Sequence, residues 1–456
     1  MTETVSEKLS DWLVGLTPSL IPEEATIGAL DTVIDTIGLA YAARDTDYMT
    51  ALVNGWETGP GRSTLFGHGK SVDTIGAAMI NGTAAHGEDF DNSYEGCPVH
   101  SGTVVVPAVF AIGESRGLSG AATFTGIAAG IEIMCRMGQI TGTGVHKAGF
   151  HPTAVIGAMA AAAGVGVALG LDRVKLTNAF GLAGSMAAGI IEYLADGSWT
   201  KRMHAGWAAQ AGIRAATMAA SGFIGPKTVF EGDHGFYFAF APSIKPDFEL
   251  LTSNLGKRWE TSNLSFKPYA CGTMCQPFVD CALQLRSEGI KSEAIDSLTC
   301  RVGEGTVHRL WAPLSLKQRP PTGYGAKFSG PYCIAVALID GDAGLAQFTD
   351  ERIVDRDLLA LTEKITFEID PENEYPKNYT GEIIGVLTDG RTVRAFQPHL
   401  RGGKNAPLTH SDLVRKFFAN LDFGRMDERA AQRLLRSLEQ LPELEDLKII
   451  GKLLLN

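Results

Sequence analysis

Residues 81–100, NGTAAHGEDFDNSYEGCPVH, form the densest group of side chains in this sequence that could do acid–base chemistry. Apolar residues at helical spacing precede this segment, so we expect it to close a helix. Residues three or four apart share a helix face, which would align His86, Asp89 and Ser93. His100 follows shortly after, so two imidazoles, a carboxylate and a hydroxyl are predicted to converge. Taken alone, the segment could also be a solvated helix end whose polar residues serve as caps.

Two further segments place imidazoles or cations at predicted helix starts. His151 stands directly before a proline in GFHPTAVIG, where the positive end of a helix dipole favours a neutral imidazole or a bound anion. In DGSWTKRMHAGW, Lys201, Arg202 and His204 open an Ala- and Gly-rich helix and would make a receptor for a carboxylate. The structural alternatives are a capping histidine and an exposed basic loop.

Two later segments add a lysine and a tyrosine. Lys267, in SFKPYAC, lies at the start of the second predicted domain, where it could reach towards the first domain or be solvated. Tyr332, in AKFSGPYCIAVAL, heads an apolar helix, where a tyrosine is more often a packed ring than a catalyst. Together these segments offer imidazoles for proton transfer and lysines for anion binding. Such a set suits removal of a proton from a carbon next to a carboxylate, with cations stabilising the charge that develops.

Metal and cofactor motifs are not expected. The seven cysteines are scattered, and the spacing of Cys271, Cys275 and Cys281 lacks the C-x-x-C element of common zinc or iron–sulfur sites. We expect these to be buried thiols. The Gly-rich runs GVGVALG and GLAGSMAAG neither follow a predicted strand nor fit G-x-G-x-x-G, which argues against a dinucleotide site.

Composition indicates a soluble globular protein with more than one core. The chain has 456 residues, 45% of them hydrophobic and 20% charged, and a formal net charge of −11 without a basic block. This balance argues against a nucleic acid or a membrane surface as partner. Acidic residues stand where a secretory signal would be basic, so we expect reduced thiols and a cytoplasmic location. The uncharged residues 154–171 approach the length of a membrane span, but are mostly Ala and Gly, and we expect a buried helix.

The elements that must position these residues are mainly helices. No strand is expected before about residue 290, and the Asp389-Gly390 pair then predicts a hairpin. The fold is predicted as mainly α, with a large all-helical domain of residues 1–265 plus 405–456 and a smaller inserted α+β lid domain of residues 266–404. Helices are expected over 6–43 (two), from near Ser71 or Asp73 through the opening segment, and over 103–141 (two), 153–170, 173–195, 203–221, 270–287, 328–341 and from 409 onward; strands are expected at 295–303, 364–370, 382–390 and 391–399.

The motifs NGTAAHGEDFDN, GFHPT, TKRMHAG, FKPYAC and KFSGPY, with His100 after the first, resemble those of the MmgE/PrpD family in order and separation. This family includes 2-methylcitrate dehydratase, cis-aconitate decarboxylase and iminodisuccinate epimerase, and the resemblance spans about residues 5–450. It implies a helical domain with an α+β lid, a homodimer, and cofactor-free catalysis on small polycarboxylates in the cleft between the domains.

The resemblance also implies roles for individual residues. His100 and His151 would be the proton-transfer pair, and Asp89 would orient His100 or the substrate. Lys201 and Lys267 would bind carboxylates. With the residues singled out above, the expected catalytic set is His100, His151, Asp89, Lys201 and Tyr332, and the expected substrate-binding set is Ser93, Lys267, His86, Arg202 and His204.

The sequence departs from the family pattern at several positions. Asn92 stands where a second acid is usual, Ser93 replaces a threonine, and His100 lies one residue further along than the decarboxylase pattern predicts. Gln276 replaces a lid histidine and cannot exchange a proton near neutral pH. We therefore expect an enzyme that abstracts a proton next to a carboxylate of a small di- or tricarboxylate. A lyase is preferred, either a dehydratase or a decarboxylase of the 2-methylcitrate or cis-aconitate type, with an epimerase of iminodisuccinate-like substrates and a non-catalytic helical binding protein as alternatives.

Overall fold

The computed structural model describes residues 3–455, and the chain divides into two compact units. The first, here called the helical unit, comprises the residues up to Gly87, Asp91–Ser265 and those from Asn420 onward. The second, the α+β unit, comprises Glu88–Phe90 and Phe266–Ala419. The chain passes from the helical unit to the α+β unit after Ser265 and returns at Asn420, and residues 88–90 belong to the α+β unit. Domains of residues 1–265 plus 405–456 and of residues 266–404 stay a prediction.

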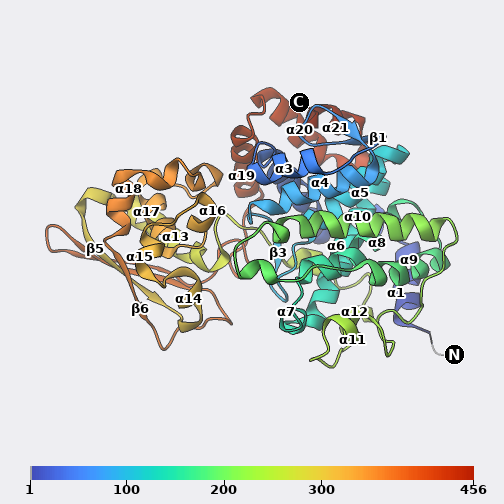
Figure 1. The fold of residues 1–456 in the computed structure, drawn as a ribbon, viewed down its shortest axis with the longest axis horizontal. Coiled ribbons are helices and arrows are strands. Elements are labelled where there is room, and N and C mark those ends of the chain that lie inside the picture. Colours follow the sequence, from blue (N-terminus) through green and yellow to red (C-terminus); the bar gives the residue numbers. More distant parts are fainter. Residues whose placement is uncertain (1–2, 456) are drawn as a thin grey trace. The chain divides into compact units, whose positions relative to one another are not determined.

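The helical unit is built mainly of long helices, joined by turns and by several longer loops (Figure 1). The fold is thus mainly α with a smaller α+β part, as predicted. Its helices are α1 (Val5–Val14), α2 (Glu23–Ala42), α3 (Asp47–Gly55), α4 (Thr74–Gly87), α5 (Ser101–Arg116), α6 (Gly120–Thr141), α7 (Gly144–Lys147), α8 (Pro152–Ala168), α9 (Arg173–Met186), α10 (Thr200–Ala220), α11 (Phe236–Phe240), α12 (Glu249–Thr252), α20 (Glu428–Glu439) and α21 (Lys448–Leu454), while α19 (His410–Phe423) crosses the boundary between the units.

Small residues bring the central helices together. Helix α8 packs against α6 and α10, and nearly all of its side chains are buried, as expected for its Ala- and Gly-rich sequence. Helices α4 and α10 cross at Gly82 and Gly206, where a Cβ on Gly206 would lie 2.0 Å from the Met79 carbonyl oxygen. Only glycine permits so close an approach of two backbones. This crossing fixes the C-terminal half of α4 against the first turns of α10.

Three local expectations for the helical unit are wrong. Helix α4 ends at Gly87, so Asp89 and Ser93 do not continue the helical face that carries His86; Asp89 adopts a left-handed conformation, with φ of 54°, and Ser93 begins a strand. The helix expected to reach residue 195 ends at Met186, because the following segment pairs with the chain around residue 150. Strands also occur before residue 290. These are β1 (Pro60–Thr64) with β2 (Ser71–Val72), and β3 (Ser93–Tyr94) with β4 (Leu264–Ser265), both pairs antiparallel and too short to show a pattern in the sequence.

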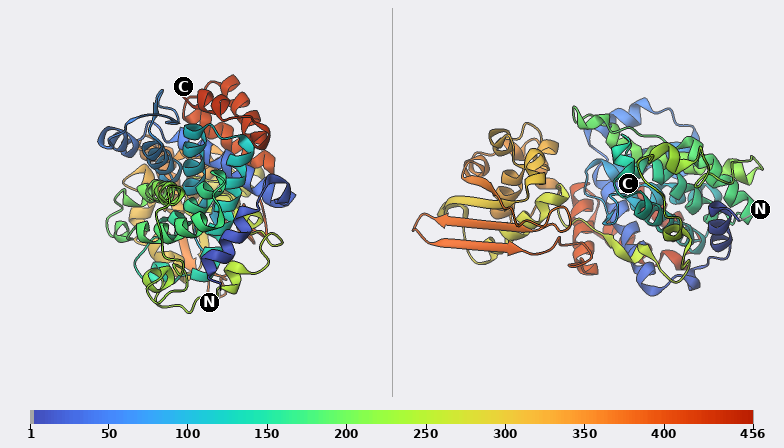
Figure 2. Two further views of the ribbon diagram at one scale, coloured as in Figure 1. Left: turned by 90° about the vertical axis from the view of Figure 1, so that its right-hand side faces the viewer. Right: turned by 90° about the horizontal axis from the view of Figure 1, so that it is seen from below.

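The α+β unit contains a four-stranded sheet of order β6-β5-β7-β8. β5 and β6 are parallel, the other pairs are antiparallel, and the predicted turn at Asp389-Gly390 joins β7 to β8. Helix α13 packs on β7 and β8 and against α17, so that helices cover one face of the sheet (Figure 2). The strands are β5 (Ile295–Val302), β6 (Ile365–Ile369), β7 (Gly381–Leu387) and β8 (Thr392–Gln397), and the helices are α13 (Gln276–Ser287), α14 (Val307–Leu310), α15 (Leu314–Gln318), α16 (Gly323–Ala326), α17 (Gly330–Asp340) and α18 (Arg356–Thr362).

Within residues 3–455, none of the helices combines the length and the apolar character that crossing a bilayer demands. The uncharged segment that raised this question forms α8, which lies in the interior of the helical unit.

Candidate active site

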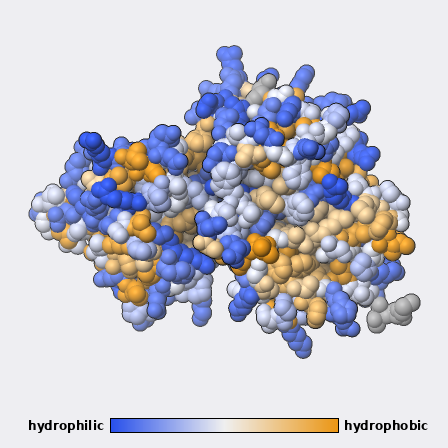
Figure 3. Space-filling view, viewed as in Figure 1, coloured by the Kyte–Doolittle hydropathy of each residue, from blue (hydrophilic) through white to orange (hydrophobic). Residues whose placement is uncertain are grey.

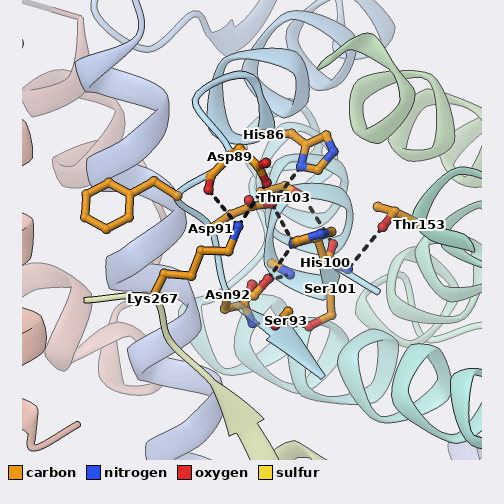
Figure 4. Close-up of polar contacts among 12 residues, drawn as sticks. His86, Asp89, Asp91, Asn92, Ser93, His100, Ser101, Thr103, Thr153 and Lys267 are labelled. Carbon is orange, nitrogen blue, oxygen red and sulfur yellow. Dashed lines mark hydrogen bonds and ion pairs between the residues drawn. The ribbon is translucent and has the colours of Figure 1, made fainter. Parts of the chain in front are cut away.

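A single buried carboxylate holds two imidazoles in the helical unit (Figure 4). Asp91 Oδ2 lies 2.7 Å from Nδ1 of His86, in the last turn of α4, and 3.2 Å from Nδ1 of His100, just before α5. All three side chains are buried. Nδ1 of His86 donates to the Asp91 carboxylate, and Nδ1 of His100 donates to the Asn92 carbonyl oxygen at 2.9 Å, which leaves the Nε2 atoms as the reactive positions of the two rings. His86 Nε2 is buried and has no hydrogen-bond partner among the residues that the structure describes.

The same three side chains are close enough to bind a cation, but their contacts are those of hydrogen bonds. His100 Nδ1 lies 2.9 Å from the Asn92 carbonyl oxygen, which can only accept. This nitrogen therefore carries a proton and does not offer a lone pair to a metal. The backbone N–H of His100 donates to Thr153 Oγ1 at 3.2 Å, which ties the start of α5 to the start of α8.

A second pair of imidazoles lies beside the first. His151 precedes α8, and His204 lies in the first turns of α10; their Nδ1 atoms are 3.2 Å apart. The His151 ring stacks on His86 with 5.6 Å between ring centres, and His86 lies 4.9 Å from His100. Tyr193 meets both His151 and His204 edge-on. Four imidazoles thus form one continuous buried group.

Burial keeps the second pair neutral. Desolvation lowers the pKa of His151 well below its ordinary value, and neighbouring His86, Lys201, His204 and His100 lower it further. Desolvation also lowers the pKa of His204 to about 4, with added effects of His86 and Lys201. Both rings are therefore neutral at pH 7 and can act as bases. The Lys201 ammonium, in the first turn of α10, supplies positive charge for an anion at a helix N-terminus.

Two other residues expected at the site have contacts elsewhere in the helical unit. The Arg202 guanidinium lies over the Tyr48 ring, 4.2 Å from its centre. The Ser93 hydroxyl lies 3.0 Å from the hydroxyl of Ser265, across the β3–β4 pair. These contacts describe a cation–π interaction and a strand pairing, and neither by itself indicates a substrate ligand.

In the α+β unit, three buried lysines bind three consecutive carbonyl groups, those of residues 88–90. Lys267 donates to the Asp89 carbonyl at 2.6 Å and to its carboxylate at 2.9 Å. Lys327 donates to the carbonyl and the carboxylate of Glu88, and Lys416 to the Phe90 carbonyl at 2.7 Å. We call these side chains the lysine clasp.

Asp89 was expected to orient His100 or the substrate. Its carboxylate pairs with Lys267, whereas Asp91 contacts both His86 and His100, a role that the sequence did not suggest. Orientation of the substrate by Asp89 stays a prediction. Sequence reasoning missed Asp91 because it extended α4 past residue 87. The chain turns away from the helix at Asp89, whose φ is 54°, and the available signal was its residue type, since aspartate is one of the few non-glycine residues that adopt this conformation.

Two other residues of the α+β unit also have internal partners. The Tyr332 hydroxyl donates to the Gln347 carbonyl at 2.7 Å, and burial raises its pKa above the ordinary value. The ring is packed against Phe348. Tyr332 is thus the packed tyrosine of the structural alternative, and these contacts do not support its expected role in proton transfer. Gln276, which begins α13, is buried and donates to the Cys271 carbonyl at 3.3 Å.

Comparisons with known proteins cover almost the whole chain. The profile of the MmgE/PrpD N-terminal domain matches residues 7–249, and that of the MmgE/PrpD C-terminal domain matches residues 269–440. The chain is 27% identical to the cis-aconitate decarboxylase-like protein oryM of Aspergillus oryzae and 26% identical to the cis-aconitate decarboxylase of Aspergillus terreus, each match covering 97% of this chain and 95% of the relative. It is 24% identical to the cis-aconitate decarboxylase of Mus musculus, over 100% of this chain and 94% of the relative. The chain therefore belongs to the MmgE/PrpD family.

Proposed function

We propose that this protein is a lyase that decarboxylates a small unsaturated tricarboxylate of the cis-aconitate class without a cofactor. The observation that carries the proposal is the group of four buried imidazoles next to Lys201, two of them held by Asp91. Imidazoles that stay neutral at pH 7 suit proton transfer, and an ammonium at a helix start suits a carboxylate. The decarboxylase names of the relatives in fungi and mouse support the choice of reaction.

The reaction needs one proton and no electron acceptor. The bond to the departing carboxylate breaks, its electron pair shifts the double bond along the carbon skeleton, and CO₂ leaves. An imidazole then donates a proton to the carbon at the other end of the former double bond, so that charge and atoms balance. In this account His151 delivers the proton, Lys201 binds a carboxylate that stays, and the ring of His100 is held in one orientation by Asp91.

An epimerase is the second candidate, and Gln276 favours it. This side chain cannot exchange a proton, and its amide is directed to the Cys271 carbonyl. Proton transfer limited to the imidazoles of the helical unit would suffice to remove and return one proton at a carbon next to a carboxylate. Both candidates begin from the same residues, so the substrate must separate them.

The test is to incubate the protein separately with cis-aconitate, 2-methylcitrate and iminodisuccinate, and to follow proton NMR spectra and CO₂ release. We expect CO₂ and new vinyl signals with cis-aconitate, and neither with the His151→Ala variant. Inversion of iminodisuccinate without CO₂ release would establish the epimerase instead. Lack of turnover of all three would contradict the proposal.

The proposed oligomeric state of this protein is a homodimer. We propose a homodimer because the helical unit exposes apolar side chains, which gather near α9 and α10 (Figure 3). Sedimentation equilibrium should give twice the 48.5 kDa mass of one chain. The exposed apolar residues near α9 and α10 are Val174, Ile190, Leu194, Trp199, Phe223 and Ile224.

All seven cysteines are free and buried, which is compatible with the cytoplasm as the proposed location.

A further inference from the structure

The two Nδ1 atoms of His151 and His204 face each other almost in line. The two nitrogens are 3.2 Å apart and the ring centres are 5.3 Å apart. The difference is about twice the distance from a ring centre to its nitrogen, so both nitrogens lie close to the line that joins the ring centres. Two lone pairs or two protons in this arrangement would repel each other. One proton therefore lies between the rings, donated by one Nδ1 to the other.

The surroundings preserve this contact. The His151 backbone N–H donates to the Gly189 carbonyl at 2.9 Å, and Gly189, at a φ of 133°, passes so close that a Cβ there would lie 2.5 Å from the Ala154 Cβ and 3.3 Å from His204 Nε2. A side chain at position 189 would push the pair apart. The ring of Tyr193 packs edge-on against both imidazoles. The loop between α9 and α10 thus holds the two rings in contact.

We propose that His204 is a proton relay behind His151 and not a ligand of the substrate. This inference rests on the proposed function. Before the transfer the pair holds one extra proton. His204 is then protonated on both nitrogens, and His151 carries its proton on Nε2 and accepts from His204 at Nδ1. When His151 gives its Nε2 proton to carbon, the Nδ1 proton of His204 moves to His151 Nδ1. Both rings are then neutral, with His151 protonated on Nδ1 and His204 on Nε2.

The surroundings of the pair explain how it gains a proton. Burial, and after it the charges of His86 and Lys201, lowers the pKa of both rings, and His100 also lowers that of His151, so an added proton is disfavoured. A polyanionic substrate beside them has the opposite effect, so that substrate binding draws one proton from water onto the pair. The reverse transfer removes a proton from carbon, so the same relay would serve an epimerase.

A substrate-free measurement tests the shared proton. In protein labelled with ¹⁵N-histidine, we expect a scalar coupling between the two Nδ1 nuclei across the hydrogen bond, and its loss in His204→Asn. Two resolved Nδ1 resonances without coupling would overturn the shared proton. Because this experiment uses no substrate, its result is independent of whether cis-aconitate is turned over.

Kinetics with the substrate found in the screen test the relay. An asparagine at position 204 can accept a hydrogen bond from His151 through Oδ1, but cannot take up the proton. We expect His204→Asn to lower kcat about 100-fold and to leave KM within about threefold, as for loss of a proton-transfer group. The exposed His234→Asn variant should match the wild type. If His204→Asn retains kcat, or raises KM alone, the relay is wrong.

Discussion

At the scale of single residues, the site depends on Asp91. Its Oδ2 atom accepts from Nδ1 of His86 and lies 3.2 Å from Nδ1 of His100, which donates to the Asn92 carbonyl oxygen, so both rings are protonated on Nδ1. A carboxylate that orients an imidazole acts through that imidazole and does not itself meet the substrate. Asp91 is therefore a positioning residue, and its loss should affect turnover more than binding.

Replacing Asp91 with asparagine should lower kcat about 10- to 100-fold, because the amide accepts less strongly and can turn its NH₂ group towards a ring. KM should change less than kcat. Steady-state kinetics and circular dichroism of the variant will measure both the effect and the fold. The exposed Asp233→Asn is the matched control. An Asp91→Asn enzyme within twofold of the wild-type kcat would remove this role.

Stability should fall in mildly acidic solution. Burial lowers the pKa of His151 well below 6.5 and that of His204 to about 4, so the unfolded chain binds more protons than the folded chain between pH 6.5 and 4. Stability is therefore fully present above pH 6.5 and is lost as the pH falls towards 4; His204 alone contributes up to about 3 kcal/mol across this window.

Urea unfolding at pH 7 and pH 5 measures this loss. The His204→Asn variant should lose less stability between the two pH values than the wild type, since it lacks one of the two groups. An equal loss in both proteins would contradict the assignment of this pH dependence to His204.

The residue types of the site could be predicted from the sequence, but their partners could not. His86, His100, His151 and His204 are recognisable because imidazoles at helix ends are uncommon and carry chemistry. Which of Asp89 and Asp91 contacts the imidazoles depends on where α4 ends. Each additional helical residue rotates the next side chain by about 100° around the helix axis. The contact between His151 and His204 joins residues 53 apart, and no local pattern encodes it.

At the scale of elements, helix crossings place the imidazoles. His86 lies one turn beyond Gly82 on α4, and His204 lies just before Gly206 on α10, so the crossing of these glycines sets the spacing of the two rings. The glycines at the crossing of α4 and α10 are thus needed to position the imidazoles as well as to pack the core.

Alanine at position 206 should destabilise the protein by about 1–3 kcal/mol, because its Cβ would lie 2.0 Å from the Met79 carbonyl oxygen and force α4 and α10 apart. Thermal unfolding measures the effect. Gly55→Ala is the control, since no atom lies within 4 Å of a Cβ at that position. Equal melting temperatures for the two variants would show that the crossing tolerates a wider spacing.

The lysine clasp should hold residues 88–90 rigid. Lys416 lies 2.7 Å from the Phe90 carbonyl and 3.9 Å from the centre of its ring, so Lys416→Met leaves a buried acceptor unsatisfied, at a cost of about 1–3 kcal/mol. Hydrogen exchange of peptides covering residues 88–90 should become faster in this variant. The exposed Lys291→Met should leave it unchanged. Unchanged exchange in Lys416→Met would mean that the clasp does not order this segment.

Long helices and alternating strands could be predicted from the sequence because each repeats its own period many times. The paired strands of two residues could not, since two residues define no period. The early end of α9 depended on pairing of its following segment with the chain near residue 150, which is a tertiary contact. The transfer of residues 88–90 to the α+β unit was equally invisible, because lysines far along the chain hold them.

At the scale of the whole molecule, a chain with net charge −11 is proposed to bind a trianion. Lys201 and the buried imidazoles of the helical unit must then create a local positive potential against the overall field. The helical unit supplies Lys201 at a helix N-terminus and the four imidazoles. The central claim is that these groups deliver the proton that replaces CO₂.

The most direct test is decarboxylation of cis-aconitate in heavy water, followed by NMR and mass spectrometry of the product. We expect each product molecule to carry one deuterium on the carbon that receives the proton, and His151→Ala to form no product while keeping the wild-type circular dichroism spectrum. Wild-type activity in His151→Ala, or product without deuterium, would contradict it.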